Sequence, residues 1–253
     1  MRCLYRETMH KCGDVYLDVD IYPVYDKQRG RGPKRRPTSE VQQKLNTRNS
    51  QRYLARLLNT NFTSRDIRFD LTYSEKCLPY SPEEALRRVQ NFFRRVKYRR
   101  KKMGLSELRY VVVTEYGEEH GRIHHHVIMS GGIDINELAE LWGQGYTTAK
   151  PLQFDDRGLV DLATYLTKKS ALSKMWSASK NLKKPERKER DGKISASRVQ
   201  EWATSGLDNR IQIEACYPGY RLVDCIPHVN EVNGGVYLAL YLIKIPDKRK
   251  KKC

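Results

Sequence analysis

The stretch Arg122-Ile123-His124-His125-His126-Val127-Ile128-Met129 sets three consecutive histidines among β-branched and apolar residues. Such a composition predicts a β-strand, whose side chains alternate between the two faces of a sheet. His124 and His126 are therefore expected on one face and His125 on the other. Two imidazoles on one face can share a metal ion, and a carboxylate from a neighbouring strand would complete a mixed nitrogen and oxygen site. Glu115 is the expected carboxylate.

The sequence on both sides of this strand predicts the rest of a sheet. Residues 108–115 are the most apolar strand candidate, expected near the centre of the sheet and paired with the histidine strand across a turn. Residues 67–73 alternate apolar and polar side chains and predict a second neighbour. Residues 146–154 predict a short edge strand, because Pro151 cannot donate to a strand ladder.

Capping residues predict where the helices of this region begin and end. Ser81 as N-cap, with Pro82 behind it and Glu84 completing a capping box, starts a helix that Gly104 ends. Its predicted buried stripe consists of Leu86, Val89, Phe93 and Val96. A second helix is expected from Asp134, with Ile135, Leu138, Leu141 and Trp142 facing inward. A third is expected over residues 158–170.

The order strand, helix, strand, strand, helix, strand, helix predicts an α+β fold, in which helices pack on an antiparallel, ferredoxin-like sheet. Three segments are expected: an N-terminal extension over residues 1–60, this core over residues 61–172, and a basic C-terminal extension over residues 173–253. In the extensions, a helix is predicted over residues 39–58. Strands are predicted over residues 15–22, 211–215, 220–224 and 236–243.

The charge of the chain favours a polyanionic partner. Lys and Arg number 48 against 30 Asp and Glu, a net charge of +18, and nucleic acid is the default partner for such a surplus. A membrane surface would call for an isolated basic amphipathic helix, which is not apparent. More cations gather at the end of the helix after Ser81 than the helix dipole needs. The expected phosphate contacts are Arg94, Arg95, Arg99, Arg100 and Lys101, with Lys169 from the third helix.

Several function classes find no support in the sequence. The six cysteines form no CxxC pair of a zinc or redox motif, and no phosphate-binding loop of an ATPase is present. No apolar run reaches the length of a membrane span, and no signal-peptide core precedes the first strand. We therefore expect a soluble protein of the cytoplasm that does not associate with membranes.

Tyr165 is the candidate nucleophile. It shares one side of its predicted helix with Lys168 and Lys169, at spacings of three and four residues. Tyrosine is a weak nucleophile at neutral pH. A divalent ion that polarises a phosphodiester would make attack feasible, and the two lysines would neutralise charge that develops on the phosphate. The product would be a phosphotyrosine ester, which conserves the energy of the broken bond.

Residues 67–73, residues 123–128 and Tyr165-Leu166-Thr167-Lys168-Lys169 together resemble the three ordered motifs of HUH endonucleases. The Glu-Tyr-Gly before the histidines and the Tyr-x-x-Lys-Lys helix are similar to the rolling-circle replication initiators of small single-stranded-DNA phages and plasmids. The resemblance covers residues 67–170. It implies the HUH core fold and a site-specific nickase of single-stranded DNA that stays linked to the 5′-phosphate and frees a 3′-OH. A lysine at position 169, where some members have a second tyrosine, implies the single-tyrosine type.

The resemblance also implies roles for individual residues. His124 and His126 would bind Mg²⁺ or Mn²⁺ with Glu115 as third ligand, while Glu118 and Glu119 are rival carboxylates. Tyr165 would be the nucleophile, and Lys168 would position the phosphate or balance its charge. The implied partners are single-stranded DNA or a hairpin at a replication origin, together with the helicase and polymerase of a prokaryotic host. His125 is expected to be structural or to face DNA.

Two other interpretations of the same residues are open. A relaxase or a single-tyrosine transposase would use the same chemistry. Relaxases typically place the tyrosine near the N-terminus, and such transposases are usually shorter. A non-catalytic nucleic-acid-binding regulator would use the histidines for a structural zinc, which calls for four protein ligands. Cleavage that needs both Mn²⁺ and Tyr165 separates the enzymes from the regulator.

Overall fold

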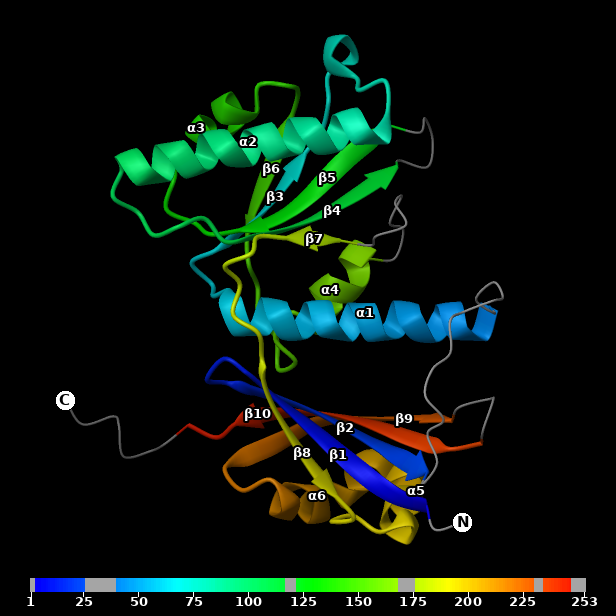
Figure 1. Cartoon of the computed structure of the whole chain (residues 1–253). Coiled ribbons are helices and arrows are strands. Elements are labelled where there is room, and N and C mark those ends of the chain that lie inside the picture. Colours follow the sequence, from blue (N-terminus) through cyan, green and yellow to red (C-terminus); the bar gives the residue numbers. More distant parts are fainter. Residues whose placement is uncertain (1–2, 26–39, 117–121, 168–175, 230–233, 247–253) are drawn as a thin grey trace, which may run out of the picture. The chain divides into compact units, whose positions relative to one another are not determined.

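The computed structural model describes residues 3–25, 40–116, 122–167, 176–229 and 234–246. The contacts within the chain divide it into two compact units (Figure 1). The first unit consists of Met1–Thr60, Asp155–Gly158 and Lys184–Cys253, and the second of Asn61–Phe154 and Leu159–Lys183. The first unit thus combines segments from both ends of the chain, and the histidine stretch lies in the second.

The second unit is built on a five-stranded antiparallel sheet in the order β6-β3-β5-β4-β7. Its strands are β3 (Ile67–Leu71), β4 (Tyr110–Tyr116), β5 (Ile123–Met129), β6 (Thr147–Pro151) and β7 (Ser177–Ala178). The histidine strand β5 is central, β4 is its neighbour, and β6 is at the edge as its proline predicts. The predicted α+β class, with helices on an antiparallel sheet, is confirmed.

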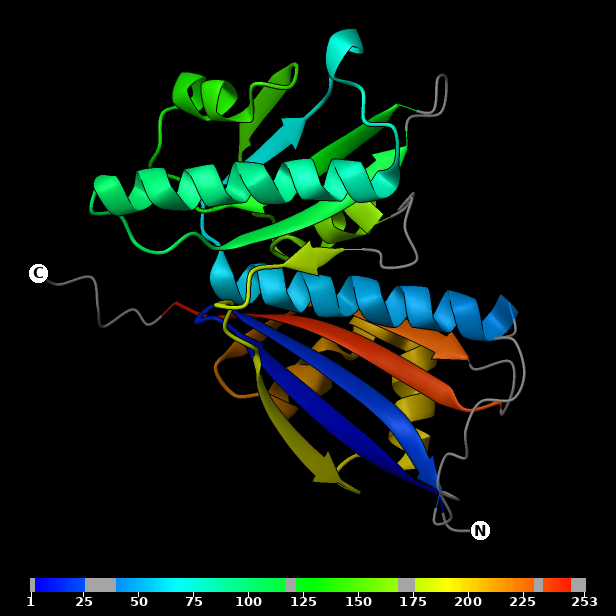
Figure 2. The ribbon, with the colours of Figure 1, turned by 45° about the horizontal axis from the view of Figure 1, so that its top comes forward.

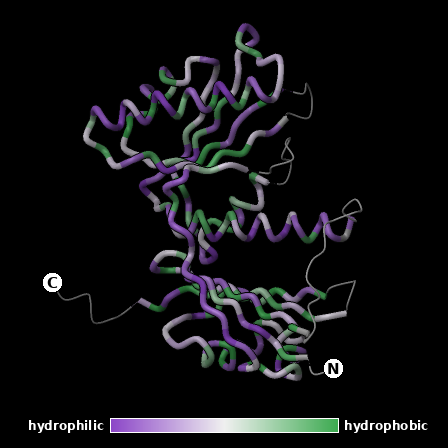
Figure 3. Tube along the Cα trace, in the orientation of Figure 1, coloured by the Kyte–Doolittle hydropathy of each residue, from purple (hydrophilic) through white to green (hydrophobic). Residues whose placement is uncertain are grey.

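Helix α2 (Pro82–Lys102) packs on one face of this sheet. Ser81 caps it as predicted, its Oγ accepting a hydrogen bond from the Glu84 amide at 3.2 Å. The Glu84 carboxylate accepts from the amide of Tyr80 at 2.7 Å, so it stabilises the chain just before the cap. Polar and apolar residues alternate along the helix (Figure 3). The buried apolar side chains are Ala85, Val89, Phe92, Phe93 and Val96.

Two short helices complete the second unit. In α3 (Ile135–Trp142), the Asp134 carboxylate accepts from two backbone amides of the first turn, and Gly143 ends the helix at a φ of 60°. Ile135 is half exposed, contrary to prediction, because α3 reaches the core through Leu138 and Trp142. The last helix, α4 (Val160–Thr167), buries Ala163, Leu166 and Thr167. A single 3-10 turn, η1 (Glu75–Cys77), precedes α2.

The first unit has its own antiparallel sheet, in the order β8-β1-β2-β10-β9 (Figure 2). Its strands are β1 (Cys3–Cys12), β2 (Tyr16–Tyr25), β8 (Glu186–Asp191), β9 (Tyr220–Val229) and β10 (Val236–Lys244). Its helices are α1 (Glu40–Asn61), α5 (Ala196–Ser205), the 3-10 turn η2 (Gly206–Asn209) and α6 (Arg210–Cys216). Its core gathers side chains such as Val19, Trp202 and Leu240.

The strand predicted over residues 211–215 is wrong, because this stretch lies within helix α6. Ile213 is buried and Ile211 is 84% exposed. Two β-branched residues at a spacing of two suggest a strand, but a short run of this kind cannot be told from one turn of helix by periodicity alone. In the described part of the chain, no helix combines the length and the hydropathy that a membrane span requires.

Candidate active site

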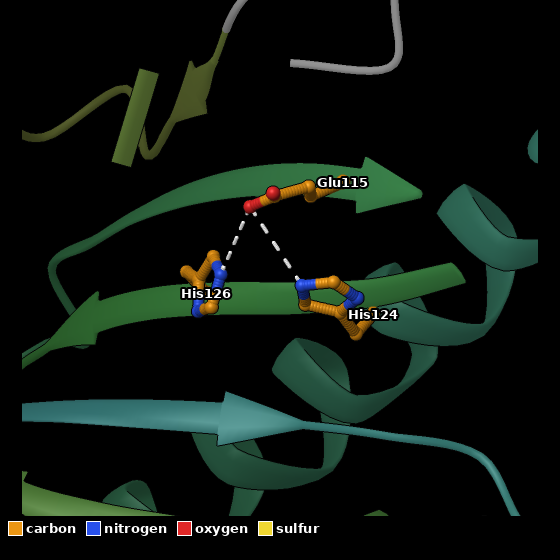
Figure 4. Close-up of side chains that lie close together, drawn as sticks. All are labelled: Glu115, His124 and His126. Carbon is orange, nitrogen blue, oxygen red and sulfur yellow. Dashed lines mark hydrogen bonds and ion pairs between the residues drawn. The ribbon is translucent and has the colours of Figure 1, made fainter. Parts of the chain in front are cut away.

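Glu115, His124 and His126 come together because β4 and β5 pair in register. Glu115 stands opposite His124 across the ladder, and His126 is two residues further along β5 on the same face. The Glu115 Oε2 atom lies 3.2 Å from His126 Nε2 and 3.7 Å from His124 Nε2 (Figure 4). One ligand atom from each of the three residues lies within 4.8 Å of the others. Two imidazoles and one carboxylate form a donor set that can hold a divalent metal ion.

Asp70 on β3 orients one of these histidines. Asp70 pairs with His126 across the ladder, and its Oδ1 atom lies 2.7 Å from His126 Nδ1. With Nδ1–H donating to Asp70, the lone pair of Nε2 is directed toward Glu115, where a metal ion would bind. Partial burial opposes ionisation of Asp70, but the hydrogen bonds with His126 and Arg68 hold the pKa of this carboxyl below its usual value.

Asp70→Asn is expected to lower the affinity for Mn²⁺ about 10- to 100-fold, as the loss of a carboxylate behind a metal-bound histidine typically does. The amide keeps the size of the side chain but no longer favours one tautomer of His126. Isothermal titration with Mn²⁺ measures the effect. The control is Asp208→Asn, an exposed carboxylate of the first unit. Wild-type affinity in Asp70→Asn would show that Asp70 does not orient the ligand.

His125 points to the opposite face of β5, as predicted from alternation. It is fully buried, and its two ring nitrogens lie 2.8 Å from the Tyr73 hydroxyl and 2.9 Å from the Thr114 hydroxyl. Burial, with a smaller contribution from the neighbouring His124 and His126, lowers the pKa of His125 to about 3. This histidine is therefore a neutral part of the core on the α2 side of the sheet.

Tyr165 on α4 lies beside the histidine pair. Its ring centroid is 6.3 Å from that of His126, and the Arg68 guanidinium stands 5.1 Å from the tyrosine ring. Arg68 also donates to Asp70 at 2.9 Å, so the tyrosine and the histidine are linked through one arginine and one carboxylate. The side chain is 59% exposed, which leaves it accessible to a large substrate.

Several predicted site residues can be placed less fully or lie elsewhere. Lys168, Lys169, Glu118 and Glu119 lie outside the described residues. The predicted phosphate contacts Arg94, Arg95, Arg99, Arg100 and Lys101 are all on α2. Arg100 is 3% exposed and donates to the backbone carbonyls of Ser106, Ser130 and Gly131. These bonds give it a structural role instead of a surface for phosphate.

Sequence reasoning missed Asp70 and Arg68 as parts of this site. A signal was present, because both occupy the polar face of the alternating stretch 67–73. An arginine and an aspartate two residues apart on a strand are, however, ordinary for a solvent-facing sheet surface. Only the register of β3 against β5 places them beside His126 and Tyr165.

Comparison with known proteins agrees with this location of the site. No curated protein and no solved structure gives a significant match to the chain. Residues 67–170 match the family model of the replication-associated proteins of the ORF2 type, and this segment contains the histidine pair, Glu115, Asp70 and Tyr165. Through this segment, the chain is similar to replication-associated proteins, which supports a function in DNA replication.

Proposed function

We propose that the protein is a metal-dependent, site-specific endonuclease of single-stranded DNA that starts rolling-circle replication. The observation that carries this proposal is the position of Tyr165 beside the cluster of Glu115, His124 and His126. A metal site next to an accessible tyrosine suits transfer of a phosphodiester to that tyrosine. The match to replication-associated proteins supports the choice of DNA as substrate.

In this proposal, Glu115, His124 and His126 hold Mg²⁺ or Mn²⁺, which supplies Lewis-acid polarisation of a non-bridging phosphate oxygen. The Tyr165 hydroxyl attacks phosphorus and loses its proton, a new O–P bond forms, and the bond from phosphorus to the 3′-oxygen breaks. The 3′-oxygen takes up a proton and leaves as a free 3′-OH. No water is consumed, so the phosphotyrosine ester retains the energy needed to rejoin the strand.

The residues around the tyrosine have supporting roles. Arg68 stands over the ring of Tyr165 and would help to fix its position while offering a cation to the phosphate. Lys168 would position the phosphate or balance its charge. The free 3′-OH would serve a host polymerase, with a host helicase opening the duplex, in the cytoplasm of a prokaryotic cell. A single nucleophilic tyrosine implies one covalent link at a time.

The test is a denaturing gel of the protein incubated with labelled single-stranded oligonucleotides from its own replicon, with Mn²⁺ or with EDTA. A slowly migrating protein–DNA adduct is expected with Mn²⁺ and not with EDTA. Tyr165→Phe is expected to abolish the adduct, because the ring remains but no oxygen can attack. The matched control is Tyr80→Phe, which removes the hydroxyl of a tyrosine that is 97% exposed. An adduct that persists in Tyr165→Phe would assign the nucleophile to another residue. Tight binding without any adduct would favour the non-catalytic regulator.

A further inference from the structure

A basic groove lies between α2 and α3, in the same unit as the candidate active site. Its volume is about 660 Å³. The lining residues are Asn91, Arg94, Arg95, Tyr98, Arg99, Lys102, Glu137 and Leu141, which amount to four cations against one carboxylate. The groove is on the α2 side of the sheet, the side to which His125 points, so it is separate from the face that carries His126 and Tyr165.

Two of the four cations hold the groove together. Arg95 donates to the carbonyls of Leu141 at 2.7 Å and Trp142 at 3.2 Å, at the end of α3. Arg99 forms an ion pair with Glu137, also on α3. These contacts tie α3 to α2 and use up much of the hydrogen-bonding capacity of both arginines. They build the walls of the groove more than they offer it charge.

The other two cations flank an exposed aromatic ring. Arg94, Tyr98 and Lys102 follow each other at intervals of four residues, so they form one stripe along about 12 Å of α2. Tyr98 is 63% exposed, and the Lys102 ammonium lies 4.8 Å from the centre of its ring. Arg94 contacts only the neutral amide of Asn91 among the hydrogen bonds and ion pairs of the described residues. Neither Arg94 nor Lys102 has a carboxylate partner there.

We infer that this groove binds a segment of single-stranded DNA, with Tyr98 as a stacking platform for a base and Arg94 and Lys102 as phosphate contacts. Surfaces that hold single strands combine a cationic groove with exposed aromatic rings in this way. The inner bases of a duplex are stacked and paired, so a duplex could use the cations but not the ring or the apolar side chain of Leu141. The inference rests on the proposed function only for the identity of the strand, which would be a part of the substrate away from the cleavage site.

The experiment measures affinity without cleavage. The full chain in EDTA is titrated into fluorescent single-stranded oligothymidine and into the matching duplex, and anisotropy is read at several NaCl concentrations. Because neither Tyr165 nor a metal ion is needed, the result is independent of whether the protein cleaves DNA. Arg94→Glu is compared with Arg87→Glu, an exposed arginine of the same helix outside the groove. Tyr98→Ala is compared with Tyr80→Ala and with Tyr98→Phe.

Tyr98→Ala is expected to weaken binding of the single strand at least about fivefold, the usual effect of losing one stacked base, while Tyr98→Phe and Tyr80→Ala remain near wild type. Arg94→Glu is expected to weaken it several-fold and to reduce the slope of log K against log salt by about 0.7, the value for one lost phosphate contact on a single strand. Since both side chains are exposed, the melting temperatures should stay at the wild-type value.

Three results would overturn the inference. The first is equal affinity in the groove variants and their matched controls. The second is an equal loss for the single strand and the duplex in Tyr98→Ala, which would remove the reason for assigning a single strand. The third is unchanged DNA affinity together with groove-dependent binding of polyglutamate, which would assign the groove to an acidic protein partner.

Discussion

Changing His124 and His126 together to alanine is expected to abolish binding of Mn²⁺ at this site and to slow strand cleavage at least about a thousandfold. The two imidazoles supply two of the three ligand atoms in the cluster, and one carboxylate cannot hold the ion alone. A metal ion contributes several kcal/mol to stabilising the charge of the transition state, and each 1.4 kcal/mol corresponds to a factor of about ten in rate. Isothermal titration with Mn²⁺ and the rate of adduct formation measure the two effects.

The matched control is His228→Ala, a histidine of the first unit. It is expected to leave both quantities unchanged. Glu115→Gln in the same titration tests the third ligand, because an amide keeps the shape of the side chain without its charge. Wild-type Mn²⁺ affinity in Glu115→Gln would shift the assignment to Glu118 or Glu119, while full binding in the double histidine variant would place the metal site elsewhere in the chain.

The second large effect concerns stability. Arg56→Met is expected to lower the free energy of unfolding of the first unit by about 3–5 kcal/mol, the usual cost of leaving a buried charge without its partner. The Arg56 side chain is 10% exposed, and it donates to Asp18 and to Asp20 at 2.6 Å each. Arg52 contacts the same two carboxylates, so the variant leaves two carboxylates for one guanidinium. Urea denaturation followed by circular dichroism measures the loss.

Arg6→Met is the matched control for this loss. Arg6 also forms two hydrogen bonds with a carboxylate, that of Asp191, but on an exposed part of the same sheet. A surface pair of this kind contributes little, so a much smaller loss is expected. Equal losses in the two variants would mean that burial of the Arg56 cluster does not decide its contribution.

The pH dependence gives a second check on the same cluster. Full burial opposes ionisation of Asp18, but the Arg52 and Arg56 guanidinium groups hold its pKa below the usual value. A carboxyl with a lowered pKa stabilises the fold above its unfolded pKa of about 3.9, and this contribution disappears as the pH falls through the folded pKa. The difference between wild type and Arg56→Met should therefore be full at neutral pH and shrink below about pH 4. A difference that stays constant into acid would exclude the Asp18 charge as its source.

Local rules were sufficient for much of the second unit. The cap at Ser81, the helix start at Asp134 and the glycine at its end were predicted from residues within one turn of each terminus. Strand alternation was sufficient to separate His125 from the metal pair, because the two-residue period of a strand does not depend on its partners. These features depend on backbone geometry within a few residues, so the sequence alone contained them.

Other features required contacts between distant residues. The buried role of Arg100 depends on carbonyl groups at positions 106, 130 and 131, which no local pattern indicates. The first unit pairs β2 with β10, which come from opposite ends of the chain. The same long-range packing explains why the prediction for the short stretch 211–215 was wrong, since burial of Ile213 is decided by the core of that unit.

The sequence by itself determined that a histidine pair shares one face of a strand and that Glu115 and Tyr165 are suitable partners. The tertiary structure alone decided that Asp70 orients His126, that Arg68 stands over Tyr165, and that Arg95 and Arg99 hold α3 while Arg94 and Tyr98 line an open groove. The physical reason is the range of the interactions. Alternation and capping act within one strand or turn, whereas the neighbours of a side chain across a sheet depend on strand register, which only the folded chain sets.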